Sequence, residues 1–216
     1  MTSSVRPAER FAGLLAQCPL VAILRGLAPP EADAAGDALF GAGFRLIEVP
    51  LNSPQPLQSI RQLSRLNGAA LVGAGTVLTA RQVDEAHDAG AQLVVAPNFN
   101  PEVVRRAVAL GLACAPGVAT PTEAFAALDA GATALKLFPA EAIPPAAVKA
   151  MRAVLPASAL LLPVGGISTA NLRTYMDAGA NGAGLGSALY KPGMAIDTLR
   201  ENAREFVAAW AGTIRA

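Results

Sequence analysis

Short apolar runs alternate with longer amphipathic stretches along almost the whole chain, and a glycine stands just before most of the apolar runs. The glycines in this place are Gly43, Gly68, Gly90, Gly111, Gly131 and Gly179. Glycine adopts the left-handed backbone at little cost, so each of them predicts the end of a helix followed by a strand. The runs themselves show little polar alternation, which is typical of parallel strands that are buried on both faces.

Each apolar run is followed by residues that favour the start of a helix. These starts are Pro29-Pro30, Ser53-Pro54, Thr79, Asn100-Pro101, Thr120-Pro121, Pro144-Pro145 and Ser168-Thr169. Their side chains cap a helix, or their prolines suit its first turn. Strands that alternate with helices at this short period pair in parallel through right-handed crossovers.

Eight such strand–helix units fill the chain at even spacing. The pattern predicts the α/β class, with residues 1–216 folded as one domain, a single (β/α)8 TIM barrel. Arg6–Ala16 is predicted to be an extra N-terminal helix before the first strand. An open, doubly wound sheet is the alternative, which the even spacing of the units disfavours.

Composition and charge exclude several classes of partner. Of the 216 residues, 53% are hydrophobic and the net charge is +1, without a basic run, so neither nucleic acid nor a membrane surface is an expected partner. No apolar run is long enough to span a bilayer, and the first residues lack the apolar core of a signal peptide. Cys18 and Cys114 fit neither a metal site nor a disulfide framework, and His87 lies in a charged, surface-like stretch. We therefore expect a cytoplasmic protein without a metal.

The apolar run Ala134–Pro139 contains one charged residue, Lys136. Side chains alternate across a strand, so Leu135 and Leu137 share one face and Lys136 points to the other. Burial lowers the pKa of a lysine, and a neutral amine can attack a carbonyl carbon to form a Schiff base. The alternative is a strand-end lysine whose ammonium group reaches solvent.

Polar residues also stand at the carboxyl ends of other predicted strands, where barrel active sites lie. Glu48 has apolar neighbours, so burial is expected to raise its pKa and suit it to proton transfer; a structural ion pair with Lys136 is the alternative. Arg25 can hold a carboxylate or a phosphate, or can be an ordinary surface arginine. The Thr76 hydroxyl can donate a hydrogen bond to a carboxylate, or it can stabilise a turn or cap a helix.

Two glycine-containing segments follow the last two predicted strands. Gly165-Gly166 precedes a predicted helix start, and Gly184-Leu185-Gly186-Ser187 ends the eighth strand. Loops at these two places of a barrel often bind phosphate through backbone N–H groups. Tight turns are the alternative reason for a pair of glycines.

Six motifs together carry a resemblance to a known family. They are Ile23–Gly26, Glu48–Ser53, Gly73–Val77, Leu135–Ala140, Pro163–Ile167 and Gly184–Tyr190. In these motifs and over nearly its full length, the chain resembles the 2-keto-3-deoxy-6-phosphogluconate/galactonate aldolase family of class I aldolases.

The resemblance implies a role for each candidate residue. Lys136 is the expected Schiff-base lysine and Glu48 the expected proton shuttle, while Arg25 and Thr76 are expected near the pyruvyl carboxylate. Gly166, Gly186 and Ser187 are expected at the phosphate. The resemblance also implies a homotrimeric (β/α)8 barrel that needs no metal and no cofactor beyond the imine on Lys136.

Two positions depart from the gluconate branch of the family and look like its galactonate branch. Asn52 stands where an arginine is usual, and Val164 stands where a threonine is usual. The expected reaction is therefore cleavage of 2-dehydro-3-deoxy-6-phospho-D-galactonate to pyruvate and D-glyceraldehyde 3-phosphate. The alternatives are the same reaction on the gluconate epimer, a non-catalytic sugar-phosphate-binding barrel, and a phosphate-barrel synthase or isomerase.

Overall fold

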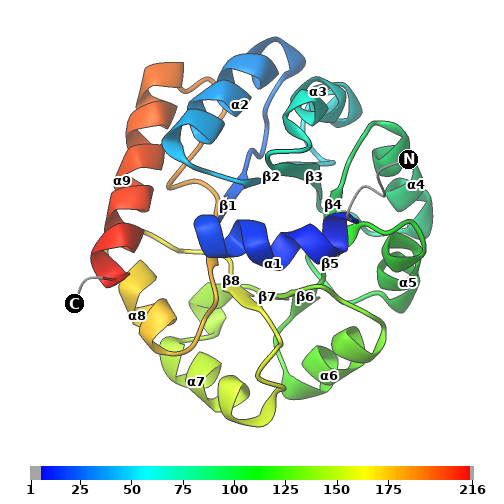
Figure 1. The fold of residues 1–216 in the computed structure, drawn as a ribbon, viewed down its shortest axis with the longest axis vertical. Helices are drawn as coiled ribbons and strands as arrows, with labels where there is room; N and C mark the ends of the chain where they lie inside the picture. Colours follow the sequence, from blue (N-terminus) through cyan, green and yellow to red (C-terminus); the bar gives the residue numbers. More distant parts are fainter. Residues whose placement is uncertain (1–5, 215–216) are drawn as a thin grey trace.

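The computed structural model describes residues 6–214 and has parallel strands surrounded by helices (Figure 1). The strands in this part of the chain are β1 Leu20–Ile23, β2 Leu46–Pro50, β3 Leu71–Gly75, β4 Leu93–Val95, β5 Ala113–Ala115, β6 Gly117–Val118, β7 Leu135–Leu137, β8 Leu161–Pro163 and β9 Ala183–Leu185. They confirm the predicted α/β class. The fifth predicted strand is interrupted at Pro116, which lacks the N–H that a central strand donates.

The helices alternate with the strands along the chain. They are α1 Pro7–Gln17, α2 Pro29–Ala42, α3 Pro56–Leu63, α4 Ala80–Asp88, α5 Pro101–Ala109, α6 Pro121–Asp129, α7 Pro145–Val154, α8 Leu172–Asp177 and α9 Ile196–Ile214, with short 3-10 turns η1 Ser64–Leu66 and η2 Ala140–Ala142. None of the helices within residues 6–214 has the length and apolar character needed to span a lipid bilayer.

The strands form two parallel sheets. Six strands pair in the order β5-β4-β3-β2-β1-β9, and three pair in the order β6-β7-β8. The sheets meet at two places: β5 and β6 are separated only by Pro116, and one parallel bridge joins Val164, just after β8, to Gly184 in β9. The carboxyl ends of all these parallel strands therefore face the same side.

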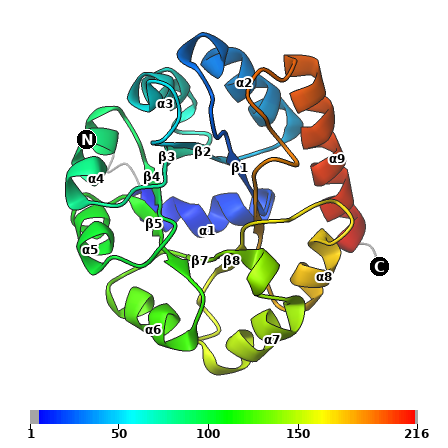
Figure 2. The ribbon, with the colours of Figure 1, turned by 180° about the vertical axis from the view of Figure 1, so that it is seen from behind.

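Buried apolar residues form two clusters on opposite sides of the strands. The larger cluster packs the strands against the surrounding helices, and Leu135 and Leu137 belong to it. The smaller cluster fills the space inside the strands and includes Phe11, Leu14 and Leu15 of α1. Helix α1 lies across one end of the strands, in front of them in Figure 1 and behind them in Figure 2. The predicted helix before the first strand thus closes the inside of the molecule at the amino ends of the strands.

The helix ends lie where the glycines predict them, but two of the predicted helix starts are wrong. The six predicted glycines all have positive φ, between 71° and 112°. The predicted start at Ser53-Pro54 is wrong, because α3 begins at Pro56 and the hydroxyl of Ser53 instead accepts a hydrogen bond from Gly26 N–H. The predicted start at Ser168-Thr169 is also wrong, because α8 begins at Leu172 after an intervening turn.

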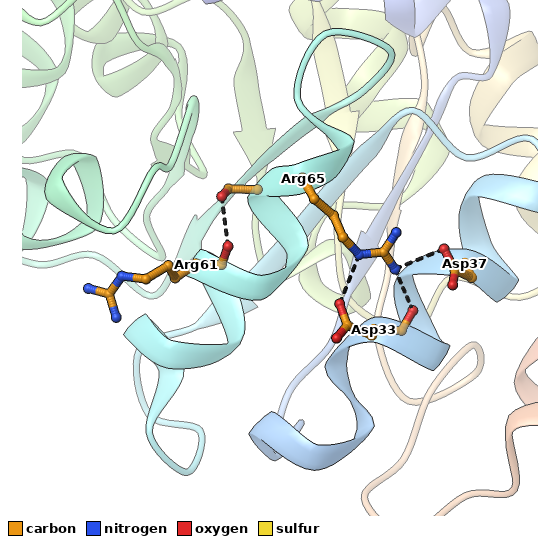
Figure 3. Close-up of polar contacts among 5 residues, drawn as sticks. Asp33, Asp37, Arg61 and Arg65 are labelled. Carbon is orange, nitrogen blue, oxygen red and sulfur yellow. Dashed lines mark hydrogen bonds and ion pairs between the residues drawn. The ribbon is translucent and has the colours of Figure 1, made fainter.

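Arg65 fastens the 3-10 turn η1 to helix α2. Its guanidinium lies 2.8 Å from a carboxylate oxygen of Asp33 and 2.8 Å from one of Asp37 (Figure 3). It also donates to the main-chain carbonyl of Asp33. All three side chains are well exposed, so the contribution to stability is about 1 kcal/mol or less for each pair.

Candidate active site

Lys136 lies on β7 and is only 4% exposed. Its side chain points away from the cluster that holds Leu135 and Leu137, and it lines the cavity inside the strands. Its Nζ lies 4.6 Å from the centroid of the Phe138 ring. Burial lowers the pKa of Lys136; the charge of Glu48 opposes this effect and the charge of Arg25 reinforces it. The fraction of neutral, nucleophilic amine at neutral pH is therefore raised.

Glu48 lies on β2 and is 1% exposed. Its Oε2 is buried and has no hydrogen-bond partner among the described residues. Burial raises the pKa of Glu48 to about 7, against the opposing charges of Lys136 and Arg25. A buried, unpartnered carboxyl group costs stability, and this pKa permits proton transfer in both directions at neutral pH.

Glu48 and Lys136 face the same cavity without forming a direct pair. Both line the space inside the strands, together with Val164 and with Phe11 from α1. Within residues 6–214 no hydrogen bond joins them and no ion pair within 4.0 Å does so. The two side chains therefore share this cavity without the close contact that a structural ion pair would make.

Arg25 follows β1 and is exposed at the carboxyl end of the strands. Its Nη1 donates to Oδ1 of Asn52, at 2.7 Å, and this contact fixes the direction of the guanidinium. Arg25 lines a cavity of about 310 Å³ that also contains Lys136. The structure therefore brings three of the residues singled out from the sequence, Arg25, Asn52 and Lys136, to one end of the molecule.

Thr76 follows β3 and has an unusual backbone, with φ at 56°. Positive φ is rare for a β-branched residue and often marks a functional site. Thr76 is half-buried, but it lines neither the cavity inside the strands nor the one that holds Arg25. Its predicted contact with a carboxylate thus stays a prediction.

The two glycine segments meet in the cavity that holds Arg25 and Lys136. Its lining includes Gly165 and Gly166 after β8, and Gly186 and Ser187 after β9. Among the described residues the backbone N–H groups of Gly166, Gly186 and Ser187 donate to no protein acceptor. Donors of this kind, together with a guanidinium, can bind a phosphate or another anion.

Two residues that shape the site escaped the sequence analysis. Gly75 lies against Glu48, since a Cβ atom there would overlap the Glu48 carboxylate. Asn171 organises the first glycine segment, because its side chain donates to the carbonyl of Gly166 at 2.8 Å and accepts from Ser168 N–H at 2.9 Å. Glycine in a strand signals a close approach, but the sequence does not reveal the partner.

The structure offers no cluster of metal ligands in the part of the chain that it describes. Among residues 6–214, no three His, Cys, Asp or Glu side chains lie together in a way that could hold a metal ion. His87 is exposed on α4, and Cys18 and Cys114 are buried free thiols.

A lysine and a carboxyl group in one cavity, beside unpaired backbone donors, define a site suited to imine chemistry on a small anionic carbonyl compound. Residues 12–207 match the family described as KDPG and KHG aldolase. The chain belongs to this aldolase family.

Named relatives agree with the match. The chain is 50% identical, over 89% of its length and 94% of the other protein, to 2-dehydro-3-deoxy-6-phosphogalactonate aldolase of Escherichia coli. It is 48% identical, over 89% and 91%, to the probable enzyme of the same name from Rhizobium meliloti. A solved structure described as native KDPGal aligns with a TM-score of 0.91 and 48% identity, over 93% of this chain and 98% of that one.

Two further solved structures bear on chemistry and assembly. KDPG aldolase from Legionella pneumophila, with pyruvate captured as a covalent carbinolamine, aligns at a TM-score of 0.77 and 26% identity, over 97% and 98% of the chains. A designed protein cage made by fusing symmetric oligomeric domains aligns at 0.89 and 48%, over 91% of this chain and 73% of that one.

Proposed function

We propose that this chain is a class I aldolase that cleaves 2-dehydro-3-deoxy-6-phospho-D-galactonate to pyruvate and D-glyceraldehyde 3-phosphate. The observation that carries the proposal is the buried Lys136, whose pKa is lowered, in one cavity with the unpartnered carboxyl group of Glu48. Family membership and 50% identity to the Escherichia coli galactonate enzyme support the choice of reaction.

The first half of the reaction builds an electron sink on Lys136. The neutral Nζ attacks the C2 ketone, and a carbinolamine forms. Glu48 then passes a proton to the carbinolamine hydroxyl, which leaves as water, and an iminium remains. The pKa of Glu48, raised to about 7, suits both the donation and the later removal of protons. The pyruvate carbinolamine captured in the Legionella pneumophila aldolase supports this step.

The second half breaks the carbon–carbon bond. Glu48, or a water that it holds, removes the proton of the C4 hydroxyl. The C3–C4 bond breaks, its electron pair moves toward the iminium nitrogen, and D-glyceraldehyde 3-phosphate leaves. The enamine that remains is protonated at C3, and hydrolysis of the resulting imine releases pyruvate and restores Lys136. The imine serves as the only electron sink, so the mechanism calls for no metal and no cofactor.

The charged ends of the substrate fit the polar groups at the carboxyl ends of the strands. We assign the phosphate to Gly166, Gly186 and Ser187, whose N–H groups are unpaired. We assign the pyruvyl carboxylate to Arg25, with Thr76 as a further donor. Because Arg25 shares the cavity with the glycine segments, its charge favours anion binding at the phosphate end as well.

The choice of epimer depends on the middle of the substrate. Val164 is 7% exposed and lines both cavities, so it faces the same space as Lys136 and the glycine segments. Valine cannot donate a hydrogen bond to a C4 hydroxyl, and Asn52 is committed to Arg25. Both features favour the galactonate epimer, with the gluconate epimer as the alternative.

The same proposal extends to the architecture of the molecule. The two sheets, joined at Pro116 and at the Val164–Gly184 bridge, are taken to form one closed (β/α)8 barrel, with α1 as the extra N-terminal helix and residues 1–216 as one domain. A homotrimer is the assembly that we propose, and the similarity to a cage built from symmetric oligomeric domains favours a symmetric oligomer. The cytoplasmic location stays a prediction.

Borohydride trapping with pyruvate tests the central claim. Reduction in the presence of pyruvate should place a three-carbon adduct on the peptide that carries Lys136, and Lys136→Arg should abolish both the adduct and turnover. Lys149→Arg and Lys191→Arg are the matched controls, because both lysines are exposed. A chelator should leave activity unchanged. An adduct on Lys149 or Lys191, or activity that needs an added divalent metal, would contradict the proposal, and the absence of any adduct would favour a non-catalytic binding barrel.

A further inference from the structure

The carboxylate of Glu141 lies on the first glycine segment. A Cβ atom on Gly165 would overlap Glu141 Oε2 and lie 3.0 Å from its Cδ, and a Cβ atom on Gly166 would lie 2.9 Å from its Cγ. The side chain of Glu141 is therefore laid across this turn, whose two glycines have φ values of 110° and 63°. Glu141 also lines the cavity that holds Arg25 and Lys136.

The backbone fixes Glu141 in this place. It belongs to the 3-10 turn η2, whose first residue, Ala140, donates its N–H to the carbonyl of Val164 at 2.9 Å. The buried hydroxyl of Tyr175 donates to the carbonyl of Ala140, also at 2.9 Å. One hydrogen bond thus ties η2 to Val164, just after β8, and the other ties η2 to helix α8. The fold therefore places the backbone of Glu141 beside the glycine turn, and its exposed side chain reaches the turn from there.

A carboxylate here opposes the other charges of the cavity. Arg25 and the N–H groups of Gly166, Gly186 and Ser187 favour an anion, whereas Glu141 adds a negative charge directly at the glycine turn. An anion that binds at Gly166 has to approach or displace this carboxylate. Like charges a few ångströms apart repel one another even where water screens them.

We propose that Glu141 competes with the phosphate group of the substrate for the Gly165-Gly166 turn. It weakens the binding of every phosphate-bearing ligand, including the product D-glyceraldehyde 3-phosphate, and so keeps the phosphate end of the cavity from being held too tightly by its own donors. The inference deepens the proposed function, since it rests on a phosphate site at these glycines.

The size of the effect follows from the charges. A single carboxylate beside a phosphate dianion in a solvent-exposed cavity should weaken binding by about three- to tenfold at low ionic strength, and by less as salt screens the repulsion. Pyruvate carries no phosphate, so its imine formation at Lys136 should not respond.

The test compares Glu141→Gln with the wild-type chain. The dissociation constants of inorganic phosphate and of glycerol 3-phosphate are measured by calorimetry at two salt concentrations, and the rate of pyruvate trapping at Lys136 is measured in the same preparations. Glu201→Gln on α9 is the matched control, because it removes the same charge from an exposed carboxylate that does not line the cavity. The melting temperature of each variant verifies that it is folded.

The proposal expects both phosphate ligands to bind Glu141→Gln about three- to tenfold more tightly at low salt, with Glu201→Gln and pyruvate trapping unchanged. Unchanged or weaker phosphate binding in Glu141→Gln overturns it. Loss of glycerol 3-phosphate affinity alone also overturns it and makes Glu141 an acceptor for a substrate hydroxyl. If neither chain binds phosphate, no anion site exists for Glu141 to oppose. If pyruvate is not trapped at Lys136, the proposed aldolase function is refuted instead, and the phosphate affinities can still be interpreted.

Discussion

Burial acts in opposite directions on the two central residues of the site. It lowers the pKa of the Lys136 ammonium and raises the pKa of the Glu48 carboxyl group to about 7. Both pKa values are thereby moved toward neutral pH, where the amine can attack and the carboxyl group can both give and take a proton. The residues achieve this without a direct contact, which would have stabilised both charged forms and reversed the effect.

Glu48→Gln separates proton transfer from structure. The amide keeps the shape of the side chain and the ability to hydrogen-bond, but it cannot carry a proton, so turnover should fall by about two to four decades. Steady-state kinetics on the phosphogalactonate substrate measure the loss, and circular dichroism verifies the fold. Near-wild-type turnover in a readily unfolded variant would make Glu48 a structural residue only.

Ionisation of the buried Glu48 determines whether the free energy of unfolding rises or falls with pH. The unfolded carboxyl group loses its proton near pH 4.5 and the folded one near pH 7, so the folded chain binds the extra proton between these values. This contribution to the free energy of unfolding is fully present below pH 4.5 and is lost as the pH rises through about 7. The loss is on the order of 2–4 kcal/mol. The lowered pKa of Lys136 has the opposite consequence: stability rises with pH between the pKa in the folded chain and the ordinary value of 10.5.

Thermal melts of wild type and Glu48→Gln from about pH 5 to about pH 8 check this sign. The melting temperature of the wild type should fall relative to that of the variant across the range. Parallel curves would mean that Glu48 is solvated in the folded state.

Val164→Thr tests how the epimer is selected. A threonine hydroxyl can hydrogen-bond one configuration at C4, and a missing partner for a buried hydroxyl costs about 1–3 kcal/mol, or roughly ten- to a hundredfold in discrimination. The variant should shift the ratio of kcat/KM toward the gluconate epimer, modestly, because Asn52 still lacks the charge of an arginine. Kinetics on both epimers measure the ratio. If the ratio does not change, or if the wild type prefers gluconate by a hundredfold or more, the epimer is selected elsewhere in the site.

At the scale of elements, helix α1 closes the inside of the strands below the reacting groups. Its Phe11 is 1% exposed and lines the same cavity as Glu48 and Lys136. An apolar ring in this place keeps water from the far side of both groups. The helix thus contributes to their shifted pKa values as well as to the core.

Phe11→Ala should therefore affect stability and chemistry together. Removal of a buried phenylalanine ring costs about 3–5 kcal/mol, and water that enters the space left behind should return the pKa of Lys136 toward its ordinary value. Denaturant melts give the first quantity, and the pH dependence of pyruvate trapping gives the second. Phe125→Ala on α6 is the matched control, since that ring is 41% exposed. A loss of stability with an unchanged trapping profile would limit α1 to a packing role.

Local signals in the sequence were sufficient for most elements and for part of the site. Thr79, Asn100 and Thr120 each cap the helix that they were expected to start, because capping depends on residues within one turn. The alternation around Lys136 correctly placed the lysine opposite its leucine neighbours. These inferences depend on neighbours in sequence, which a single chain displays directly.

Contacts between distant segments were beyond the reach of such signals. The predicted helix start at Ser53-Pro54 failed because Ser53 accepts a hydrogen bond from Gly26 N–H across the site. The contacts of Gly75 with Glu48 and of Glu141 with Gly165 join separate strands and turns. Such pairs become visible only when the register of the strands is known.

At the scale of the whole molecule, the pairing of the strands is uneven. Five residue pairs join β2 to β3, whereas one bridge, Val164 to Gly184, joins the end of β8 to β9. Val164 packs closely there, since a Cβ atom on Gly184 would lie 2.6 Å from its Cγ2. The glycine segments assigned to the phosphate follow β8 and β9 on either side of this weak junction.

Hydrogen exchange should therefore reveal a junction that opens first and that a ligand closes. Amides with few ladder hydrogen bonds open at lower free energy, so peptides that span 161–166 and 183–187 should exchange faster than peptides that span 46–50 and 71–75. A phosphate held by Gly166 on one side and by Gly186 and Ser187 on the other would tie β8 to β9, so saturating glycerol 3-phosphate should slow exchange at the junction and leave β2 and β3 unchanged. Mass spectrometry with and without the ligand measures both effects. Equal protection of the two regions would show that β8 and β9 are joined as firmly as β2 and β3, and slowing confined to one of the two glycine segments would place the phosphate on that segment alone.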